Sequence, residues 1–395
     1  MAAGAPASYA RAVQMRRRPL VLLTLALVLV GPFALGYRLS QGSRATAPVA
    51  IPSVVDQVRE ALAEQYYRAV PTAVLHLGSV GEMLSALGDP YTAYLGPADY
   101  LLLRQETASH YSGIGVSVLP SPRGLVVVSL RPGPAEQAGV RPGDMIVRIG
   151  ATPTLRLGMS AAFARILGPP GTSVRLELRR RGRRLDLNIR RATVRAPVVD
   201  AKLLSYAGRR WGVLRLSAFR VGAAVVLRRQ IRMLERQGVN GLVLDLRQNP
   251  GGLFDQAVAV SSLFLDRGIV VSLTGAHNPR HVYRAFPGLA THLPLVVLVD
   301  RLTASSAEIV AAALRDNERA TIVGERTYGK ALVQSIDPLD NGAALELTIG
   351  HYYTPSGEDI SRVGVVPQIH AVDDPRTPQD EALSAALRVL ARPTS

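Results

Sequence analysis

The chain has 395 residues, a formal net charge of +16 at pH 7 and no cysteine, with 48% hydrophobic and 19% charged residues. This length and balance are typical of a folded protein with two or three domains. The missing cysteines exclude disulfides, thiolate zinc sites and a cysteine nucleophile. None of the seven histidines forms an H-E-x-x-H pair, so the sequence argues against a metalloprotease, and we expect no metal and no cofactor.

Most of the positive charge lies in two segments. Residues 1–45 carry six arginines and no acid, and residues 174–195 carry nine arginines against Glu177 and Asp186. We expect the second segment to be a strand hairpin whose arginines face solvent, with attraction to anionic lipid headgroups as the alternative. Aromatic residues do not alternate with these arginines, so no nucleic-acid partner is expected.

Lysine is far rarer than arginine in this chain. Of the 46 basic residues, only Lys202 and Lys330 are lysines. Biased codon usage explains a general preference for arginine. A retained lysine nevertheless hints at a task that needs an amine able to lose its proton, which arginine cannot do.

The first predicted element is an apolar stretch at residues 19–37 that contains no charged side chain. At about 1.5 Å per residue it can cross a hydrocarbon core about 30 Å thick. Arginines at 16–18 favour a cytoplasmic location for residues 1–18, which sends the rest of the chain to the periplasmic or cell-surface side. We therefore predict an uncleaved anchor in the cell membrane, followed by a linker at 38–52. The alternative is a signal peptide cleaved after A-T-A at 45–47, which would release a secreted protein.

Residues 53–107 are expected to form a small helical region. Apolar residues recur at helical spacing over 53–70, and further helices are predicted over 79–87 and from about residue 97. The residues expected on the buried face of the first helix are Val54, Val55, Val58, Leu62 and Tyr66.

From Tyr111 the hydrophobic period changes to that of strands. Three motifs then follow in order: S-G-I-G-V at 112–116, G-P-A-E-Q-A-G-V-R-P-G-D at 133–144 and G-P-P-G-T at 168–172. Together they resemble a PDZ domain, which we assign to residues 108–195. A glycine-rich loop offers free backbone N–H groups to a terminal carboxylate. We therefore expect the carboxyl end of a bound peptide or protein to lie at Gly113, Ile114, Gly115 and Val116.

Residues 196–372 alternate strand and helix patterns, which predicts an α/β core, and residues 373–395 are expected to form a C-terminal tail or helix. Strands are expected at 211–216, 241–246 and 295–299, the last being a continuous apolar run typical of a central strand. The helix between the first two is expected to place Val225, Ile231 and Leu234 on its inner side.

Ser305 lies where the last of these strands turns into a predicted helix. With Glu308 it fits the capping box S-x-x-E, a structural role worth about 1 kcal/mol. The segment G-K-A-L-V-Q at 329–334 suggests a chemical role, because Lys330 and Gln334 share a face on either a strand or a helix. A neutral lysine can activate a serine hydroxyl. Lowering a lysine pKa from about 10.4 to about 7 costs roughly 4–5 kcal/mol, so such a site must be dry.

A third motif, D-L-R-Q-N-P-G-G at 245–252, ends a predicted strand. As an isolated turn, N-P-G-G is more often structural than functional. Next to a nucleophile, however, its free N–H groups could hold the oxygen of a tetrahedral intermediate. Gly251 or Gly252, together with the Ser306 N–H at the start of the helix, would form this oxyanion hole.

These motifs, in this order after a PDZ-like domain, resemble those of the carboxyl-terminal processing peptidases, also called tail-specific proteases, over roughly residues 53–370. The resemblance implies a multidomain α/β protein with a crotonase-like catalytic core. It also implies a serine endopeptidase in which Ser305 is the nucleophile, Lys330 the general base and Gln334 the residue that orients the lysine. Its substrates would be proteins or peptides with free carboxyl termini, and the resemblance leaves formation of a homo-oligomer open.

Some residues depart from the family pattern. Thr303, Ser306 and Ala307 stand where the family usually has Ser, Ala and Ser, so Ser306 is an alternative nucleophile. The interval of 25 residues to Lys330 favours Ser305. Leu167 stands where the family often has an arginine.

Two other functions are consistent with parts of the sequence. One is a non-catalytic, membrane-anchored PDZ adaptor on a protease-like fold. The other is a trypsin-like protease with a PDZ domain, which would need a Ser-His-Asp set that these motifs do not contain.

Overall fold

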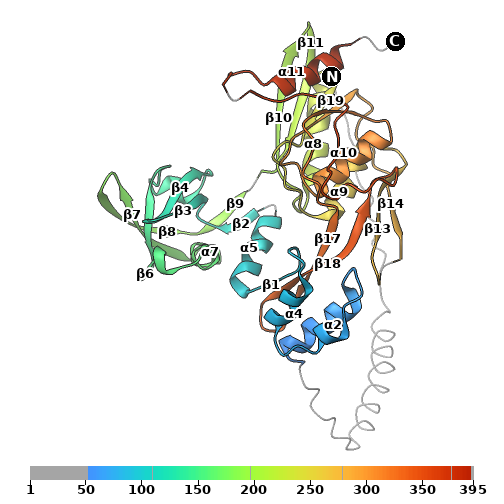
Figure 1. Cartoon of the computed structure of the whole chain (residues 1–395). Helices are drawn as coiled ribbons and strands as arrows, with labels where there is room; N and C mark the ends of the chain where they lie inside the picture. The colour runs from blue at the N-terminus through green and yellow to red at the C-terminus, as the bar shows by residue number, and fades with distance from the viewer. Residues whose placement is uncertain (1–51, 109, 196, 278, 375, 393–395) are drawn as a thin grey trace, which may run out of the picture. The chain divides into compact units, whose positions relative to one another are not determined.

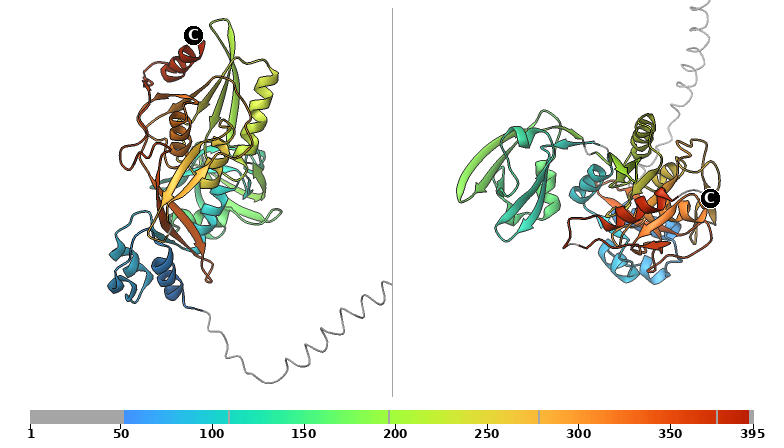
Figure 2. Two further views of the ribbon diagram at one scale, coloured as in Figure 1. Left: turned by 90° about the vertical axis from the view of Figure 1, so that its right-hand side faces the viewer. Right: turned by 90° about the horizontal axis from the view of Figure 1, so that it is seen from above.

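The computed structural model describes residues 52–108, 110–195, 197–277, 279–374 and 376–392. The predicted membrane segment at 19–37 lies outside these ranges. Among the described residues, no helix combines the length and the apolar character needed to span a bilayer. Figures 1 and 2 show how the helices and strands are arranged.

The helical region contains the three helices expected from the sequence. Ser53 caps the helix that begins at Val54, and Ser79 caps the helix that begins at Val80. Each serine side chain accepts a hydrogen bond from a backbone N–H in the first turn. The first helix ends earlier than expected because Tyr66 adopts an extended conformation, although its side chain is still buried. The elements are α2 (Val54–Gln65), α3 (Thr72–Leu75), α4 (Val80–Leu87), β1 (Ala93–Leu95) and α5 (Pro97–Thr107).

A β-rich domain follows, built on an antiparallel sheet in the order β3-β4-β5-β7-β8. Alternating apolar residues of these strands pack with helix α7 around a core that includes Ile146, Leu176 and Ile166. The strands are β3 (Val116–Ser121), β4 (Gly124–Leu130), β5 (Met145–Ile149), β6 (Thr152–Pro153), β7 (Ser173–Arg180) and β8 (Arg183–Arg190). The helices are α6 (Pro134–Gln137), the 3-10 turn η1 (Thr154–Arg156) and α7 (Met159–Ile166).

The arginine-rich hairpin is β7 and β8, but only part of its charge faces solvent. Arg180 pairs with the buried Asp144 at 2.7 Å. Arg191 donates to the carbonyl oxygens of Arg165, Ile166 and Ser173. The expectation that the arginines face solvent is therefore wrong for these two side chains, because the buried Asp144 and the carbonyl oxygens of neighbouring segments accept hydrogen bonds from them.

The α/β core has a six-stranded sheet in the order β10-β11-β12-β15-β16-β19, parallel except for β10 at one edge. Helices cover both faces: α8, α9 and α10 pack on one side and α11 on the other (Figures 1 and 2). The strands are β10 (Val199–Tyr206), β11 (Arg209–Leu216), β12 (Leu242–Asp245), β15 (Leu295–Val299), β16 (Thr321–Gly324) and β19 (Ile369–His370). The helices are α8 (Ala223–Arg236), α9 (Phe254–Ser261), α10 (Ser306–Asp316) and α11 (Glu381–Ala391).

Val225, which we expected on the inner side of α8, lies on its solvent-facing side. Val225 is 65% exposed, whereas Leu227, Ile231 and Leu234 are buried. Positions i, i+4 and i+7 share one helix face, and Val225 lies about 200° around the helix from Leu227.

A second sheet, in the order β1-β18-β13-β14 with β17 also paired to β18, adjoins this core. Its strand β18 packs against α2 through Leu345 and Leu347. Figure 1 shows β17 and β18 extending from the core towards α2 and α4. The strands are β13 (Ile269–Thr274), β14 (His281–Arg284), β17 (Leu332–Pro338) and β18 (Ala344–Tyr353).

Two short strands carry the chain into and out of the β-rich domain. They are β2 (His110–Gly113) and β9 (Ala192–Arg195), and they pair antiparallel with each other. Just before β2, the Thr107 carbonyl at the end of α5 accepts a hydrogen bond of 3.0 Å from the Val221 N–H of the core.

Candidate active site

One cleft of about 230 Å³ brings the predicted catalytic residues together. Ser305, Lys330 and Gln334 all line it. They come from three places: the residue before α10, the loop before β17, and β17 itself. Helix α5 contributes Leu103 and Thr107 to the same cleft.

Ser305 occupies a strained turn between β15 and α10. Its φ of 55° and ψ of −120° lie outside the conformations that a side chain ordinarily allows, and such strain is concentrated at functional sites. The turn passes very close to the glycine loop after β12. A Cβ atom on Gly251 would lie 2.9 Å from the Ser305 Cβ and 2.8 Å from the Ala304 carbonyl oxygen. Only glycine allows this approach.

The neighbouring serine is in a different environment. Ser306 is 2% exposed, and its hydroxyl donates to the Gly252 carbonyl oxygen at 2.9 Å. Ser305 is partly exposed in the cleft. Of the two serines, Ser305 is therefore the one with a hydroxyl that a substrate can reach.

Two buried groups tie the backbones of Ser305 and Lys330 together. The Glu308 carboxylate accepts the N–H of Ser305 at 2.8 Å and the N–H of Lys330 at 3.0 Å. The hydroxyl of the buried Tyr352 donates to the Lys330 carbonyl oxygen at 2.7 Å, and the Ser305 carbonyl oxygen, at 3.3 Å, shares the same proton more weakly. Sequence reasoning assigned Glu308 only to a helix cap and gave Tyr352 no role. The S-x-x-E motif was the available signal for Glu308.

The surroundings of Lys330 favour loss of its proton. Burial lowers the pKa of Lys330, while the carboxylates of Glu346 and Asp89 oppose this effect. Its Nζ lies 4.8 Å from the centre of the Tyr91 ring. Lys330 and Tyr91 also line a second cavity, of about 430 Å³. Among the described residues, the buried Nε2 of Gln334 has no hydrogen-bond partner.

In the loop that follows β12, the backbone N–H of Gly251 is hydrogen-bonded and that of Gly252 is free within the described residues. The Gly251 N–H donates to the Asn249 side-chain oxygen at 2.9 Å, and Asn249 is itself fully buried. Gly251 and Leu253 pair with Phe219 through backbone bonds of 2.9 and 2.8 Å. Within the described ranges, the N–H groups of Gly252 and Ser306 find no acceptor.

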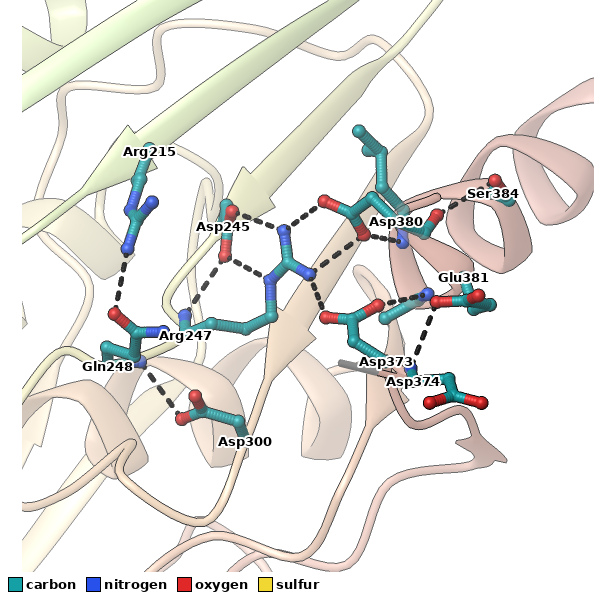
Figure 3. Close-up of polar contacts among 12 residues, drawn as sticks. Arg215, Asp245, Arg247, Gln248, Asp300, Asp373, Asp374, Asp380, Glu381 and Ser384 are labelled. Atoms are coloured by element: carbon teal, nitrogen blue, oxygen red, sulfur yellow. Dashed lines mark hydrogen bonds and ion pairs between the residues drawn. The ribbon is translucent and has the colours of Figure 1, made fainter. Parts of the chain in front are cut away.

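An arginine network fixes the start of this loop (Figure 3). Arg247 donates to Asp245 at the end of β12 and to Asp380 at the start of α11, with N–O distances of 2.8–3.0 Å, and it also pairs with Asp373. Burial alone would lower the pKa of Arg247, but hydrogen bonds to the two aspartates raise it instead. The next residue, Gln248, donates its N–H to Asp300 at 2.9 Å, which joins the loop to the segment before Ser305.

The predicted carboxylate loop also faces a cavity. Ile114, Gly115 and Val116 line a hollow of about 140 Å³, whereas the preceding Gly113 is buried and does not line it. This hollow does not include Ser305, and the cleft that holds Ser305 does not include the Gly113–Val116 loop.

Comparison with known proteins gives two family matches. Residues 210–371 match peptidase family S41, and residues 126–180 match the PDZ domain. A carboxyl-terminal-processing protease from Synechocystis is 36% identical over 325 residues, which are 79% of this chain and 76% of that protein. Carboxy-terminal processing protease CtpA of Bacillus subtilis is 32% identical over 320 residues, 80% and 68% of the two chains.

A solved structure is similar as well. The photosystem II D1 C-terminal processing protease matches with a TM-score of 0.55 and 30% identity, covering 86% of this chain and 96% of that one. A putative S41 protease from Bacteroides fragilis shares the fold, with a TM-score of 0.53 at 18% identity.

Proposed function

Because this chain belongs to the carboxyl-terminal processing proteases of peptidase family S41, we propose that it cleaves proteins near their carboxyl termini with Ser305 as nucleophile and Lys330 as general base. The chain is a serine hydrolase that acts on peptide bonds and carries a PDZ domain. The assignment of individual residues rests on the geometry of the cleft.

The observation that carries the proposal is the pairing of a strained, accessible serine with a half-buried lysine in one cleft. The Ser306 hydroxyl is buried and already bonded, which supports Ser305 over its neighbour. Burial lowers the pKa of Lys330, which increases the fraction of neutral amine at neutral pH. A neutral amine can remove the proton of a serine hydroxyl as that oxygen attacks a carbonyl carbon.

The reaction would run in two steps. The Ser305 oxygen attacks the scissile carbonyl while its proton moves to Lys330, which then returns a proton to the departing amine. Water next attacks the acyl-enzyme and gives a proton to Lys330, which passes a proton to the departing Ser305 oxygen as the bond to the new carboxyl end breaks. Among the described residues Lys330 Nζ makes no hydrogen bond to the Ser305 hydroxyl, so these transfers require the two groups to come within hydrogen-bond distance. The unpartnered Gln334 Nε2 supports an orienting role, since a neutral amine can accept its hydrogen bond.

The oxyanion is assigned to the N–H groups of Gly252 and Ser306. Both belong to residues lining the cleft, and both lack an acceptor within the described part of the chain. Gly251 is a poorer candidate than Gly252, because Asn249 uses its N–H. Donors placed in advance at a developing negative charge are among the largest contributions to catalysis.

We also propose that the protein is tethered to the cell membrane and acts on extracytoplasmic substrates. This part rests on the uncharged residues 19–37 and the arginines that precede them. The Gly113–Val116 loop would receive the substrate's carboxyl end.

The test of the dyad compares Ser305→Ala, Ser306→Ala and Lys330→Ala with the wild type on an unstructured protein that has an apolar tail. We expect Ser305→Ala and Lys330→Ala to lose activity and Ser306→Ala, which keeps its backbone N–H, to retain a large part of it. Full activity in Ser305→Ala or Lys330→Ala would refute the assignment. Inactivity of the wild type as well would favour a non-catalytic adaptor.

A further inference from the structure

Two arginines from different parts of the fold face the cavity of the PDZ groove. Arg131 follows β4 in the PDZ domain, whereas Arg220 lies between β11 and α8 of the catalytic core. Both line the hollow of about 140 Å³ that also holds Ile114 and Gly115. The catalytic core thus contributes a charged side chain to the groove of the PDZ domain.

Neither guanidinium is neutralised by an acid in contact with it. No ion pair within the described ranges includes Arg131 or Arg220. The Nε atom of Arg220 is buried and has no hydrogen-bond partner among the described residues. Glu106 of α5 lines the cavity and attracts Arg220 without forming an ion pair. The Arg131 side chain shares a hydrogen bond with the hydroxyl of Tyr111, which carries no charge to balance it. Leaving the partly buried Arg220 without a counter-charge is costly, so this pair of arginines favours an anion between them.

The rest of the cavity indicates which anion fits. The N–H groups of Ile114 and Gly115 have no acceptor within the described part of the chain, and they add donors suited to a carboxylate. The remaining surface is mostly apolar, and it is formed by Leu102, Val116, Phe163, Ile166 and Leu167. An apolar residue at the end of a peptide presents both groups: a carboxylate and, beside it, an apolar side chain.

We propose that Arg131 and Arg220 together bind the terminal carboxylate of the substrate when its last residue is apolar. This inference rests on the proposed function, since it specifies how the substrate of that reaction is selected. Arginine suits the task because its planar fork of N–H groups can donate two parallel hydrogen bonds to one carboxylate.

Arg220 also lies next to the residues that hold the proposed oxyanion loop. Phe219, its neighbour, donates to the Gly251 carbonyl at 2.9 Å and accepts from the Leu253 N–H at 2.8 Å. Val221, on the other side, donates to the Thr107 carbonyl at the end of α5. A carboxylate bound to Arg220 would therefore contact the residue next to Phe219, whose backbone holds Gly251 and Leu253 on either side of Gly252.

The experiment measures binding in the Ser305→Ala protein, so it does not depend on turnover. A fluorescent peptide with an apolar last residue is titrated as a free acid and as a carboxyl-terminal amide. We expect the acid to bind about tenfold to a hundredfold more tightly, as is typical of hydrogen bonds to a charged group. Arg220→Gln and Arg131→Gln should each reduce this acid-to-amide ratio by about tenfold, while Arg220→Lys retains part of it.

Arg229→Gln is the matched control, because it removes an exposed arginine of α8. It should leave the ratio unchanged. Equal ratios in the wild type and Arg220→Gln, with unchanged melting temperatures, would overturn the inference and leave the peptidase assignment intact. An amidated peptide with an internal aspartate should bind as weakly as the plain amide. If it binds like the free acid, the site does not select chain termini and the inference is also wrong.

Discussion

Replacing Glu308 tests whether this buried carboxylate holds Ser305 and Lys330, the proposed nucleophile and base, in place. Its two oxygens accept four hydrogen bonds and it is fully buried. One oxygen accepts from Thr327 and Gly329, at 2.5 and 2.7 Å. The other accepts from the N–H groups of Ser305 and Lys330. The loss in the free energy of unfolding can therefore be estimated for each substitution from the hydrogen bonds that it removes.

In Glu308→Gln, one oxygen becomes an NH₂ group that cannot accept. If it faces Ser305 and Lys330, two buried N–H groups lose their acceptor, at about 2–6 kcal/mol in total. If it faces Thr327 and Gly329, the Gly329 N–H is left unpaired, and the Thr327 hydroxyl must turn its proton elsewhere so that its oxygen, which already accepts from the Val365 N–H, can also accept from the new NH₂ group. We expect this second orientation and a loss of about 1–3 kcal/mol in the free energy of unfolding. Burial raises the pKa of Glu308, so removing its charge offsets part of the loss.

Glu308→Ala leaves all four donors unpaired and removes the link between Ser305 and Lys330. We expect kcat/KM to fall by about a hundredfold under conditions where the variant is folded, as is common for a displaced catalytic group. Glu308→Gln should keep most activity, because its remaining oxygen still accepts from both residues. Denaturant unfolding and peptide hydrolysis measure the two effects, with the exposed Glu318→Gln as control. Wild-type kcat/KM in Glu308→Ala would refute the reasoning.

Three further predictions concern charges near the site. Lys330→Arg should reduce kcat by about 10²–10⁴-fold, because arginine stays protonated and cannot act as a base; undiminished hydrolysis would contradict this. In the wild type, kcat/KM should rise with pH as Lys330 loses its proton. The Glu346 carboxylate raises the pKa of Lys330, so Glu346→Gln should move this rise to lower pH. An unchanged or higher midpoint in the pH profile would count against that role. Arg247→Met should destabilise the fold by about 3–5 kcal/mol in urea unfolding, since it leaves the buried Asp245 unpaired; a loss under about 1 kcal/mol would show that the network is not needed.

Much of the local structure could be predicted because it depends on short-range patterns. The continuous apolar run at 295–299 became the central strand β15, and serine caps mark the starts of α2 and α4. The motifs around Ser305 and Lys330 also pointed to one cleft. Helix periodicity was less reliable where several apolar residues adjoin, as the exposed Val225 shows.

The supporting interactions could not be predicted, because they join residues that are distant in sequence. Tyr352 reaches the carbonyl oxygens of Ser305 and Lys330 from β18, 22 residues or more further along the chain. The Asn249 side chain accepts from the Gly251 N–H and donates to the carbonyl oxygen of Leu216 at the end of β11. This leaves the Gly252 N–H, rather than that of Gly251, available to a ligand. Arg220 entered the PDZ groove from another domain, which no local pattern reveals.

The most direct measurement of the central claim is identification of the acylated residue. An ester substrate that forms the acyl-enzyme faster than water removes it is mixed with the protein and quenched in acid. Peptide mapping by mass spectrometry then locates the adduct, with Ser305→Ala and Lys330→Ala as controls. We predict an adduct on Ser305 in the wild type and none in either variant. An adduct on Ser306, or equal acylation in Lys330→Ala, would contradict the account.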